Sequence, residues 1–253
     1  MEYLLFLLIG ITGNVIGTLV GGGGLITLPT MMLVGIPVHS AIGANKVSNM
    51  VSAFSSFYTI YKRKELSWSE MRSVLLVSLV GGTLGGLFAS FMSSQTLTFI
   101  AIILLGFALI MSFIGGAEFG EKESFTMNRK NGPILLGVGF YDGMFGPGSS
   151  TLALYTYAHE KISYIKAVGL SRVGVFAMCS GAAITYIATG KIDWPLTIVL
   201  MAGSVIGAQI GIILARKVKA NQVKLLLRIV TIVLIVQLLY DFIKQLKGGD
   251  IHV

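Results

Sequence analysis

The chain has 253 residues, of which 54% are hydrophobic and only 12% are charged, and its net charge is +8. A soluble domain of this size needs more charge to keep its surface hydrated, so the composition excludes a soluble fold and, with it, a soluble nucleic-acid-binding protein. The basic excess is instead typical of cytoplasmic loops that meet anionic membrane lipids.

Apolar runs separated by short polar clusters follow one another along the chain. They cover residues 3–20, 25–36, 41–61, 71–92, 96–114, 133–158, 164–188, 194–216 and 223–243. Several are about 20 residues long, which suits an α-helix crossing a bilayer core of about 30 Å. Because hydrocarbon offers no partner to an unpaired backbone group, we predict an all-α polytopic membrane protein.

Two glycine-rich breaks interrupt the helical pattern, at residues 21–24 (GGGG) and 146–150 (GPGSS). Glycine carries a high entropic cost in a helix and proline removes an amide donor. A broken helix persists at membrane depth only where it is buried or lines a cavity. A helix that restarts after such a break presents free amides and a positive dipole end, which favour an anion, and Ser149, Ser150 and Thr151 add hydroxyl donors. The alternative is close helix packing or a simple hinge.

Two cations lie about five residues into apolar runs, Lys46 beside Asn45 and Arg172 beside Ser171. Ionisable residues inside membrane segments are costly and usually functional. The pair would suit a carboxylate or sulfonate, with bidentate contacts from Arg172 and a point charge from Lys46. The alternative is that both snorkel to the membrane interface. On the first reading, Lys46→Ala or Arg172→Ala abolishes anion binding and leaves the protein folded.

Four other positions leave alternatives open. Asp142, which precedes the second break, either exchanges a proton and couples transport to a gradient, or pairs with Arg172 for structural reasons. Asn49 and Gln209 either line a pore or bond between helices. His39 is interpreted as an ordinary loop histidine.

An internal duplication relates the two halves of the chain. A shift of 126 positions places Gly13 on Gly139, Lys46 on Arg172 and Trp68 on Trp194. It also superimposes the glycines at 17, 22, 81 and 85 on those at 143, 148, 207 and 211. An ungapped offset over this distance indicates a repeat, whose tryptophans we interpret as interfacial anchors at opposite faces.

Loop charge favours inverted copies. If the segments 3–36 and 133–158 each dip in and return, fourteen lysines and arginines fall on one side and only Lys191, Lys244 and Lys247 on the other. The predicted organisation is then a first membrane repeat at 1–114, a cytoplasmic linker at 115–131, a second repeat at 132–247 and a polar tail at 248–253. Each repeat is a glycine-broken helical hairpin plus three transmembrane helices. One objection is that residues 3–20 alone reach about 27 Å, nearly a full crossing.

The glycine cluster followed by residues 25–29 (LITLP) and 41–45 (AIGAN), and its repeat at 143–148 (GMFGPG) and 167–169 (AVG), resembles the sulfite exporter TauE/SafE family of membrane permeases. The resemblance covers nearly the whole chain. It implies a multi-pass plasma-membrane transporter for sulfite, thiosulfate, sulfoacetate or other organosulfonates, and sometimes carboxylates. The chain departs from the family pattern at Pro147, at Ser149 and Ser150, and at Ala44.

Taken together, we expect an alternating-access carrier for a small anion, with membrane lipids as its surroundings and a homodimer among the open oligomeric states. An anion channel is the first alternative; a membrane-embedded enzyme or lipid-binding protein is the second. We find no metal spacing, nucleophile elbow or P-loop, and therefore expect no enzyme activity, cofactor or metal. The expected substrate site comprises Gly22, Gly23, Gly24, Asn45, Lys46, Asn49, Gly146, Gly148, Ser149, Ser150, Ser171 and Arg172, with Asp142 as the proton-coupling candidate.

Overall fold

The computed structural model describes residues 2–218 with short gaps, and isolated helical positions beyond them. The gaps are at 22, 90, 94–95, 97–98, 100–102, 104–118, 189 and 191, and the isolated positions are 222, 225, 229, 232–233, 236, 239–240 and 243. The predicted runs at 96–114 and 223–243 therefore lie largely outside the described residues. Gly22, the polar tail and the three basic residues expected on the second side of the membrane lie outside them entirely.

Helices make up the regular structure of the described residues, which contain no strand and only an isolated bridge between Lys122 and Ile162. The helices are α1 (Glu2–Val20), α2 (Gly23–Leu33), α3 (Val38–Lys62), α4 (Trp68–Ala89), α6 (Asn131–Met144), α7 (Ser149–His159), α8 (Tyr164–Ala188) and α9 (Trp194–Ala215). The all-α prediction is confirmed for this part of the chain. Trp68 and Trp194 each begin a helix, as the duplication predicted, whereas His39 lies in the first turn of α3 rather than in a loop.

Among the described residues, four helices are long and apolar enough to cross a membrane: α1, α4, α8 and α9. The central helix α3 has 25 residues but is less apolar, because it carries a row of buried polar side chains that face other helices. By contrast α2, α6 and α7 have 11, 14 and 11 residues. At about 1.5 Å per residue none of these three reaches across a core of about 30 Å.

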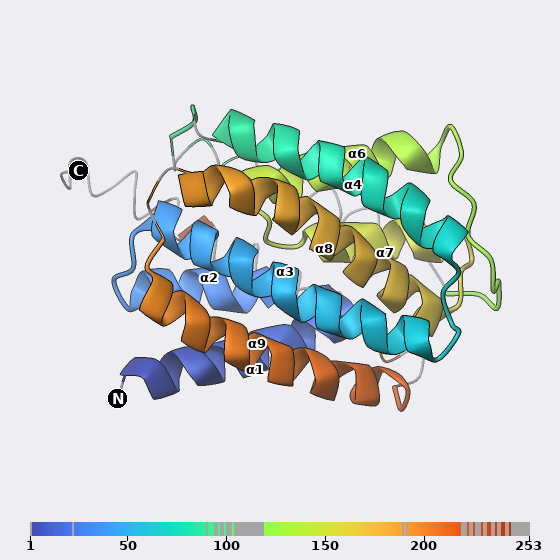
Figure 1. The fold of residues 1–253 in the computed structure, drawn as a ribbon, viewed down its shortest axis with the longest axis horizontal. Helices are drawn as coiled ribbons and strands as arrows, with labels where there is room; N and C mark the ends of the chain where they lie inside the picture. The colour runs from blue at the N-terminus through green and yellow to red at the C-terminus, as the bar shows by residue number, and fades with distance from the viewer. Residues whose placement is uncertain are drawn as a thin grey trace.

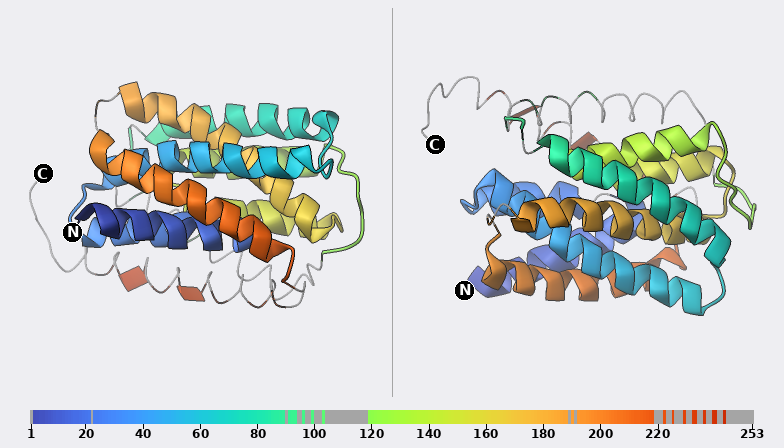
Figure 2. Two further views of the ribbon diagram at one scale, coloured as in Figure 1. Left: turned by 60° about the horizontal axis from the view of Figure 1, so that its bottom comes forward. Right: turned by 45° about the horizontal axis from the view of Figure 1, so that its top comes forward.

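Equivalent helices of the two halves pack in equivalent ways. In Figure 1, α1 lies beside α9, α4 beside α6, and α3 and α8 lie between these pairs; the right-hand view in Figure 2 shows the same order. Glycine permits the close contacts. A Cβ on Gly207 would lie 2.2 Å from the carbonyl oxygen of Ile11, and one on Gly85 would lie 1.9 Å from that of Phe140. Backbones therefore touch at both seams, as small residues allow in membrane helices.

The central helices α3 and α8 run antiparallel. Gly43, near the start of α3, contacts Tyr186 at the end of α8, while Gly169, near the start of α8, contacts Ile60 at the end of α3. Since α3 and α8 occupy equivalent places in the two halves, this crossing joins the copies at the middle of the molecule.

Two helical hairpins enter the bundle from opposite ends. The first hairpin is α1 with α2, where Gly23 packs on Gly13 and Gly17; the second hairpin is α6 with α7. Their turns use positive φ angles at Gly21 (81°), Gly146 (105°) and Gly148 (81°), which glycine adopts without strain. The tips touch, because Thr151 Oγ1 donates to the carbonyl of Val20 at 2.9 Å. The two breaks thus meet.

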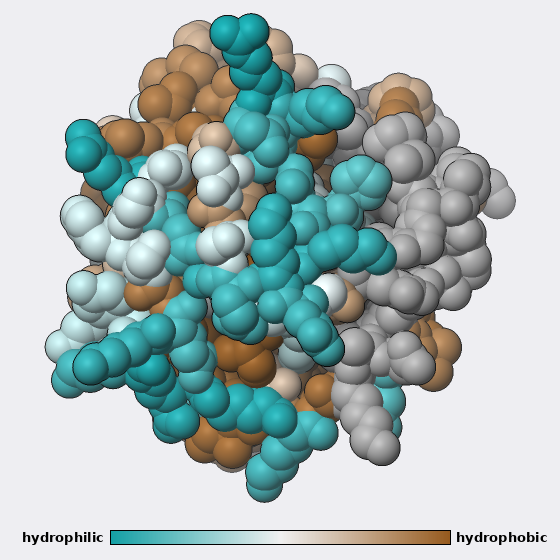
Figure 3. Space-filling view, turned by 90° about the vertical axis from the view of Figure 1, so that its right-hand side faces the viewer, coloured by the Kyte–Doolittle hydropathy of each residue, from teal (hydrophilic) through white to brown (hydrophobic). Residues whose placement is uncertain are grey.

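Basic side chains gather at one end of the bundle, where α3, α7 and α9 end and α4, α6 and α8 begin. Figure 3 looks onto this end and shows a largely hydrophilic face. The described basic residues there are Lys62, Arg63, Lys64, Arg72, Lys122, Arg129, Lys130, Lys161, Lys166, Arg216 and Lys217. Within the described ranges, no lysine or arginine lies at the other end.

Candidate functional site

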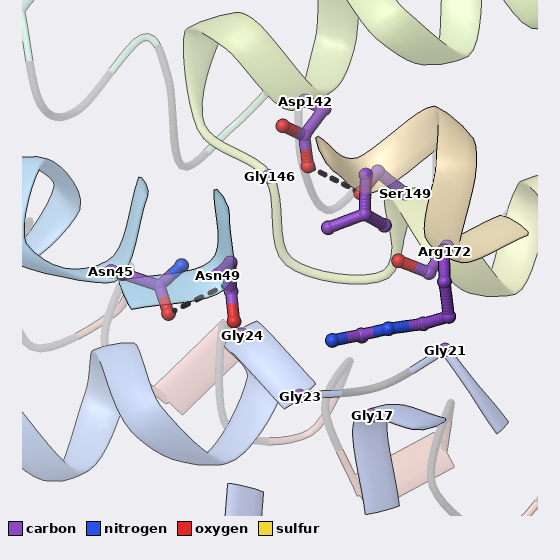
Figure 4. A pocket seen from close by; sticks show the side chains of 12 residues that line it. Gly17, Gly21, Gly23, Gly24, Asn45, Asn49, Asp142, Gly146, Ser149 and Arg172 are labelled. Carbon is purple, nitrogen blue, oxygen red and sulfur yellow. Dashed lines mark hydrogen bonds between the residues drawn. The ribbon is translucent and has the colours of Figure 1, made fainter. Parts of the chain in front are cut away.

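A small pocket lies where the two hairpin tips meet, bordered by α3 and α8 (Figure 4). Both tips supply it with glycine backbone, so main-chain atoms approach the space without intervening side chains. Its lining is Gly17, Gly21, Gly23, Gly24, Asn45, Asn49, Asp142, Gly146, Ser149, Ser150, Arg172 and Val175.

Most of the residues proposed from the sequence meet at this pocket. Gly23, Gly24, Asn45, Asn49, Gly146, Ser149, Ser150, Arg172 and the coupling candidate Asp142 line it. Three others do not. Lys46 and Ser171 are buried behind it, and Gly148 shapes the second tip as the residue that precedes α7.

Lys46 forms an ion pair with Asp142 across the two halves. Its Nζ lies 2.8 Å from Oδ2 of Asp142 and also donates to the main-chain carbonyl of that residue. Lys46 is fully buried, with 0% of its surface exposed. The alternative in which Asp142 pairs with Arg172 is therefore wrong. The alternative in which Lys46 snorkels to the membrane interface is wrong as well, because α6 brings the carboxylate of Asp142 to Lys46 on α3.

The second tip is built around the same carboxylate. Ser149 Oγ donates to Asp142 Oδ1 at 2.5 Å, and the buried Cys179 thiol lies 3.5 Å from Oδ2. A Cβ at Gly146 would lie 2.5 Å from Lys46 Nζ, so a larger residue there would collide with the ammonium group. The glycine at position 146 therefore permits both the positive φ and the close approach of Lys46.

Amide side chains from α3 form the opposite wall. Asn45 Oδ1 accepts from Thr27 Oγ1 of α2 at 2.7 Å and from Asn49 Nδ2 at 3.1 Å. These bonds hold both amides at the start of α2, beside Gly24. Gln209, by contrast, bonds Ser55 of α3 at 2.6 Å, so it links two helices and does not line the pocket.

Arg172 reaches the first half of the chain. Its guanidinium donates to Ser52 Oγ at 3.1 Å and to Asn14 Oδ1 at 3.4 Å, while Ser52 also donates to Asn14. Among the described residues, no carboxylate pairs with Arg172, and its Nε and Asn14 Nδ2 have no hydrogen-bond partner. With 3% of its surface exposed, Arg172 is a buried, uncompensated cation facing the pocket.

Sequence reasoning missed five residues of this region. Gly17, Gly21 and Val175 line the pocket, while Asn14 and Ser52 orient Arg172. The last two had a usable signal, since each is a polar residue inside an apolar run. Among the residues that the structure describes, no group of His, Cys, Asp and Glu side chains could hold a metal ion.

Comparison with known proteins assigns this architecture to a family. A family model described as Sulfite exporter TauE/SafE matches residues 5–238. A probable membrane transporter protein of Sinorhizobium sp. is 29% identical over 89% of this chain and 88% of its own length. The probable membrane transporter protein YfcA of Escherichia coli is 27% identical over 89% and 85%. One from Haemophilus influenzae is 25% identical over 92% of each. No solved structure matches the chain significantly.

Proposed function

The chain belongs to the sulfite exporter TauE/SafE family of membrane transporters, and we propose that it carries a small sulfur-containing anion across the plasma membrane by alternating access. The substrate would be sulfite, an organosulfonate or a sulfur-containing carboxylate. One observation carries the proposal: Arg172 faces a pocket between two helix breaks and has no acidic partner among the described residues.

The chemistry of the pocket supports an oxyanion. The N-terminal residues of α2 and α7, Gly24, Ser149 and Ser150, face it, so the positive ends of two helix dipoles converge on one space. The guanidinium of Arg172 adds a formal positive charge, and its fixed donors match the oxygens of a planar carboxylate or a pyramidal sulfite. A negative group placed here would offset the cost of burying that cation.

Helix directions support an inverted repeat. The equivalent helices α3 and α8 run antiparallel, and the hairpins enter from opposite ends (Figure 1). In transporters built from inverted repeats, the substrate site lies at broken helices near the bilayer midplane, and one part rocks against the other to expose it to each side in turn. The meeting of both tips at one pocket suits this mechanism.

Charge at the helix ends supports an orientation. The basic end contains residues 119–131 of the linker and eleven lysines and arginines among the described residues. By the positive-inside rule this end is cytoplasmic, and the cytoplasmic assignment extends to the linker at 115–131. The hydrophilic face in Figure 3 would then meet the cytoplasm and the anionic headgroups around it.

Asp142 provides a route for coupling to protons. Its carboxylate faces the pocket and holds Lys46, so protonation would release the ammonium group and change the charge beside the substrate. We propose that a proton bound at Asp142 accompanies or exchanges with the anion. Uptake that ignores a pH gradient would remove this part of the proposal and leave anion transport intact.

The decisive experiment measures anion binding and transport by wild type and Arg172→Gln. Purified protein is titrated calorimetrically with sulfite, methanesulfonate, sulfoacetate and acetate, and uptake is followed in proteoliposomes with and without a pH gradient. We expect saturable binding of a sulfur oxyanion by wild type and its loss in Arg172→Gln. Arg216→Gln is the matched control, because Arg216 sits in a half-exposed pair with Glu65 at the basic end.

The outcomes separate the alternatives. Saturable uptake with counterflow supports a carrier, whereas unitary currents in planar bilayers would identify a channel. Wild-type binding by a correctly folded Arg172→Gln would overturn the assignment of the site. If wild type binds none of the four anions, the proposed function is wrong.

A further inference from the structure

Lys46 and Arg172 are equivalent in the duplication, and each reaches the hairpin of the other half. Lys46 on α3 contacts Asp142 in α6, and Arg172 on α8 contacts Asn14 in α1. The two halves thus repeat one arrangement: a buried cation on a central helix directed at the opposite hairpin. The charge of the partner differs, because the residue equivalent to Asp142 is Ile16.

The two cations differ in whether their charge and their hydrogen-bond donors have partners. Lys46 has a carboxylate, whose oxygens are further bound by Ser149 and Cys179. Within the described ranges, Arg172 has only neutral partners, and its Nε and the neighbouring Asn14 Nδ2 lack any hydrogen bond. A buried donor without a partner costs free energy unless a ligand or water completes it. The first cation therefore has its anion within the chain, and the second has none in the part of the chain that the structure describes.

Asp142 and Arg172 line the same pocket, as Figure 4 shows, while Lys46 stands behind Gly146. The pocket is thus faced by one bare cation and one carboxylate that Lys46 neutralises from behind. Resting on the proposed function, we propose that Asp142 acts as a tethered anion and determines specificity. The carboxylate of Asp142 binds Lys46 in the way that the transported anion binds Arg172. Because Lys46 is already neutralised, only Arg172 remains to bind an anion, which restricts the pocket to anions with a single charged group.

The inference predicts a change in selectivity for charge when Asp142 is neutralised. Asp142→Asn keeps the size of the side chain and an oxygen that accepts from Ser149, but leaves Lys46 uncompensated. Two uncompensated cations then act on the pocket, Arg172 from its wall and Lys46 from behind Gly146. Sulfoacetate, with two acidic groups, should gain at least about tenfold in affinity relative to methanesulfonate, which has one, because a second charge acts within a few ångströms at low effective dielectric constant. Calorimetric titration of purified protein measures both dissociation constants.

A cycle of variants separates this effect from a loss of structure. Lys46→Gln leaves the carboxylate of Asp142 uncompensated beside the pocket and should weaken the binding of both anions. The double variant Lys46→Gln/Asp142→Asn removes both charges and should return the affinity ratio of the two anions to the wild-type value. Glu65→Gln makes the same carboxylate-to-amide change at a half-exposed pair far from the pocket and should leave the ratio unaltered.

Each result decides between two statements. If wild type binds neither these two anions nor sulfite nor acetate, the proposed function itself is wrong. If wild type binds methanesulfonate and Asp142→Asn leaves the ratio unchanged, only the tethered anion is refuted. If Asp142→Asn does not fold, the double variant replaces it, because it buries no unpaired charge. The double variant must then bind both anions more tightly than Lys46→Gln does. Equal affinities of these two variants would overturn the inference.

Discussion

In the part of the chain that the structure describes, two buried ion pairs join the halves, one at the centre and one at the basic end. At the centre, Lys46 meets Asp142 at 2.8 Å; at the end, Lys166 of α8 meets Glu70 of α4 at 3.0 Å. Both pairs are buried and both cross the boundary between the copies. They differ in what else the carboxylate touches.

At the basic end the carboxylate of Glu70 is saturated by local structure. It accepts from the backbone and hydroxyl of Ser67 and from the backbone of Phe125 at 2.7 Å, which fastens the linker to the start of α4. Phe125 packs edge-on against Tyr157, with ring centroids 5.2 Å apart. These contacts cap the start of α4 and tie it to the linker and to α8, so the pair works as a structural staple.

At the centre the carboxylate of Asp142 borders a pocket with an uncompensated arginine opposite. A buried ion pair is weak support for stability, because hydrophobic residues of similar volume often serve as well. The comparison therefore teaches that the same chemistry occurs in two settings: at the end it anchors the linker, and at the centre it sets the charge beside a pocket. Each prediction below tests one side of this contrast.

The largest expected effect on stability is that of Lys46→Ala. It leaves the carboxylate of Asp142 buried without its cation, which should lower the free energy of unfolding by about 3–5 kcal/mol. This revises the expectation from sequence that the variant folds normally. Thermal unfolding of the purified protein measures the change, and Lys46→Ala/Asp142→Ala should recover part of it. A wild-type midpoint for Lys46→Ala would contradict the burial of the pair.

A smaller effect is expected for Glu70→Gln. The amide still offers one acceptor but loses the charge that pairs with Lys166, so we expect a loss of about 1–3 kcal/mol. Anion affinity should remain at the wild-type value, because none of the staple residues lines the pocket. Calorimetry and thermal unfolding on one preparation test both statements. Altered affinity in a folded variant would show that the basic end is coupled to the site.

The smallest effect is expected for Glu65→Gln, which breaks the Arg216–Glu65 pair. The side chains of Arg216 and Glu65 are 30% and 28% exposed, and their charges are therefore screened by solvent. The unfolding free energy should change by less than about 1 kcal/mol. A larger loss, measured by the same unfolding assay, would mean that the basic end depends on this pair as well as on Glu70.

The sequence predicted much of this architecture for identifiable reasons. Helix starts at Trp68 and Trp194 follow from aromatic anchors at the edges of apolar runs, and the breaks follow from glycine and proline. The 126-residue offset placed Lys46 and Arg172 at equivalent depths. Depth along a helix can be read from spacing, because each residue adds a fixed rise.

The pairing of these cations could not be predicted in the same way. The helix that faces Lys46 depends on how α6 packs against α4, and on contacts such as that of Gly85 with Phe140, which join segments far apart in the sequence. Asn14 and Ser52 were overlooked for the same reason, since their importance comes from Arg172 on another helix.

By itself, the sequence determined the membrane class, the approximate positions of the helices and the positions of the breaks, because hydropathy, glycine and proline act locally on the backbone. Tertiary structure alone decided that Asp142 neutralises Lys46 and leaves Arg172 bare. The pairing of Lys46 with Asp142 depends on how the helices are rotated and packed against one another. A buried charge is stable only beside a compensating partner, so the packing decides which charges pair.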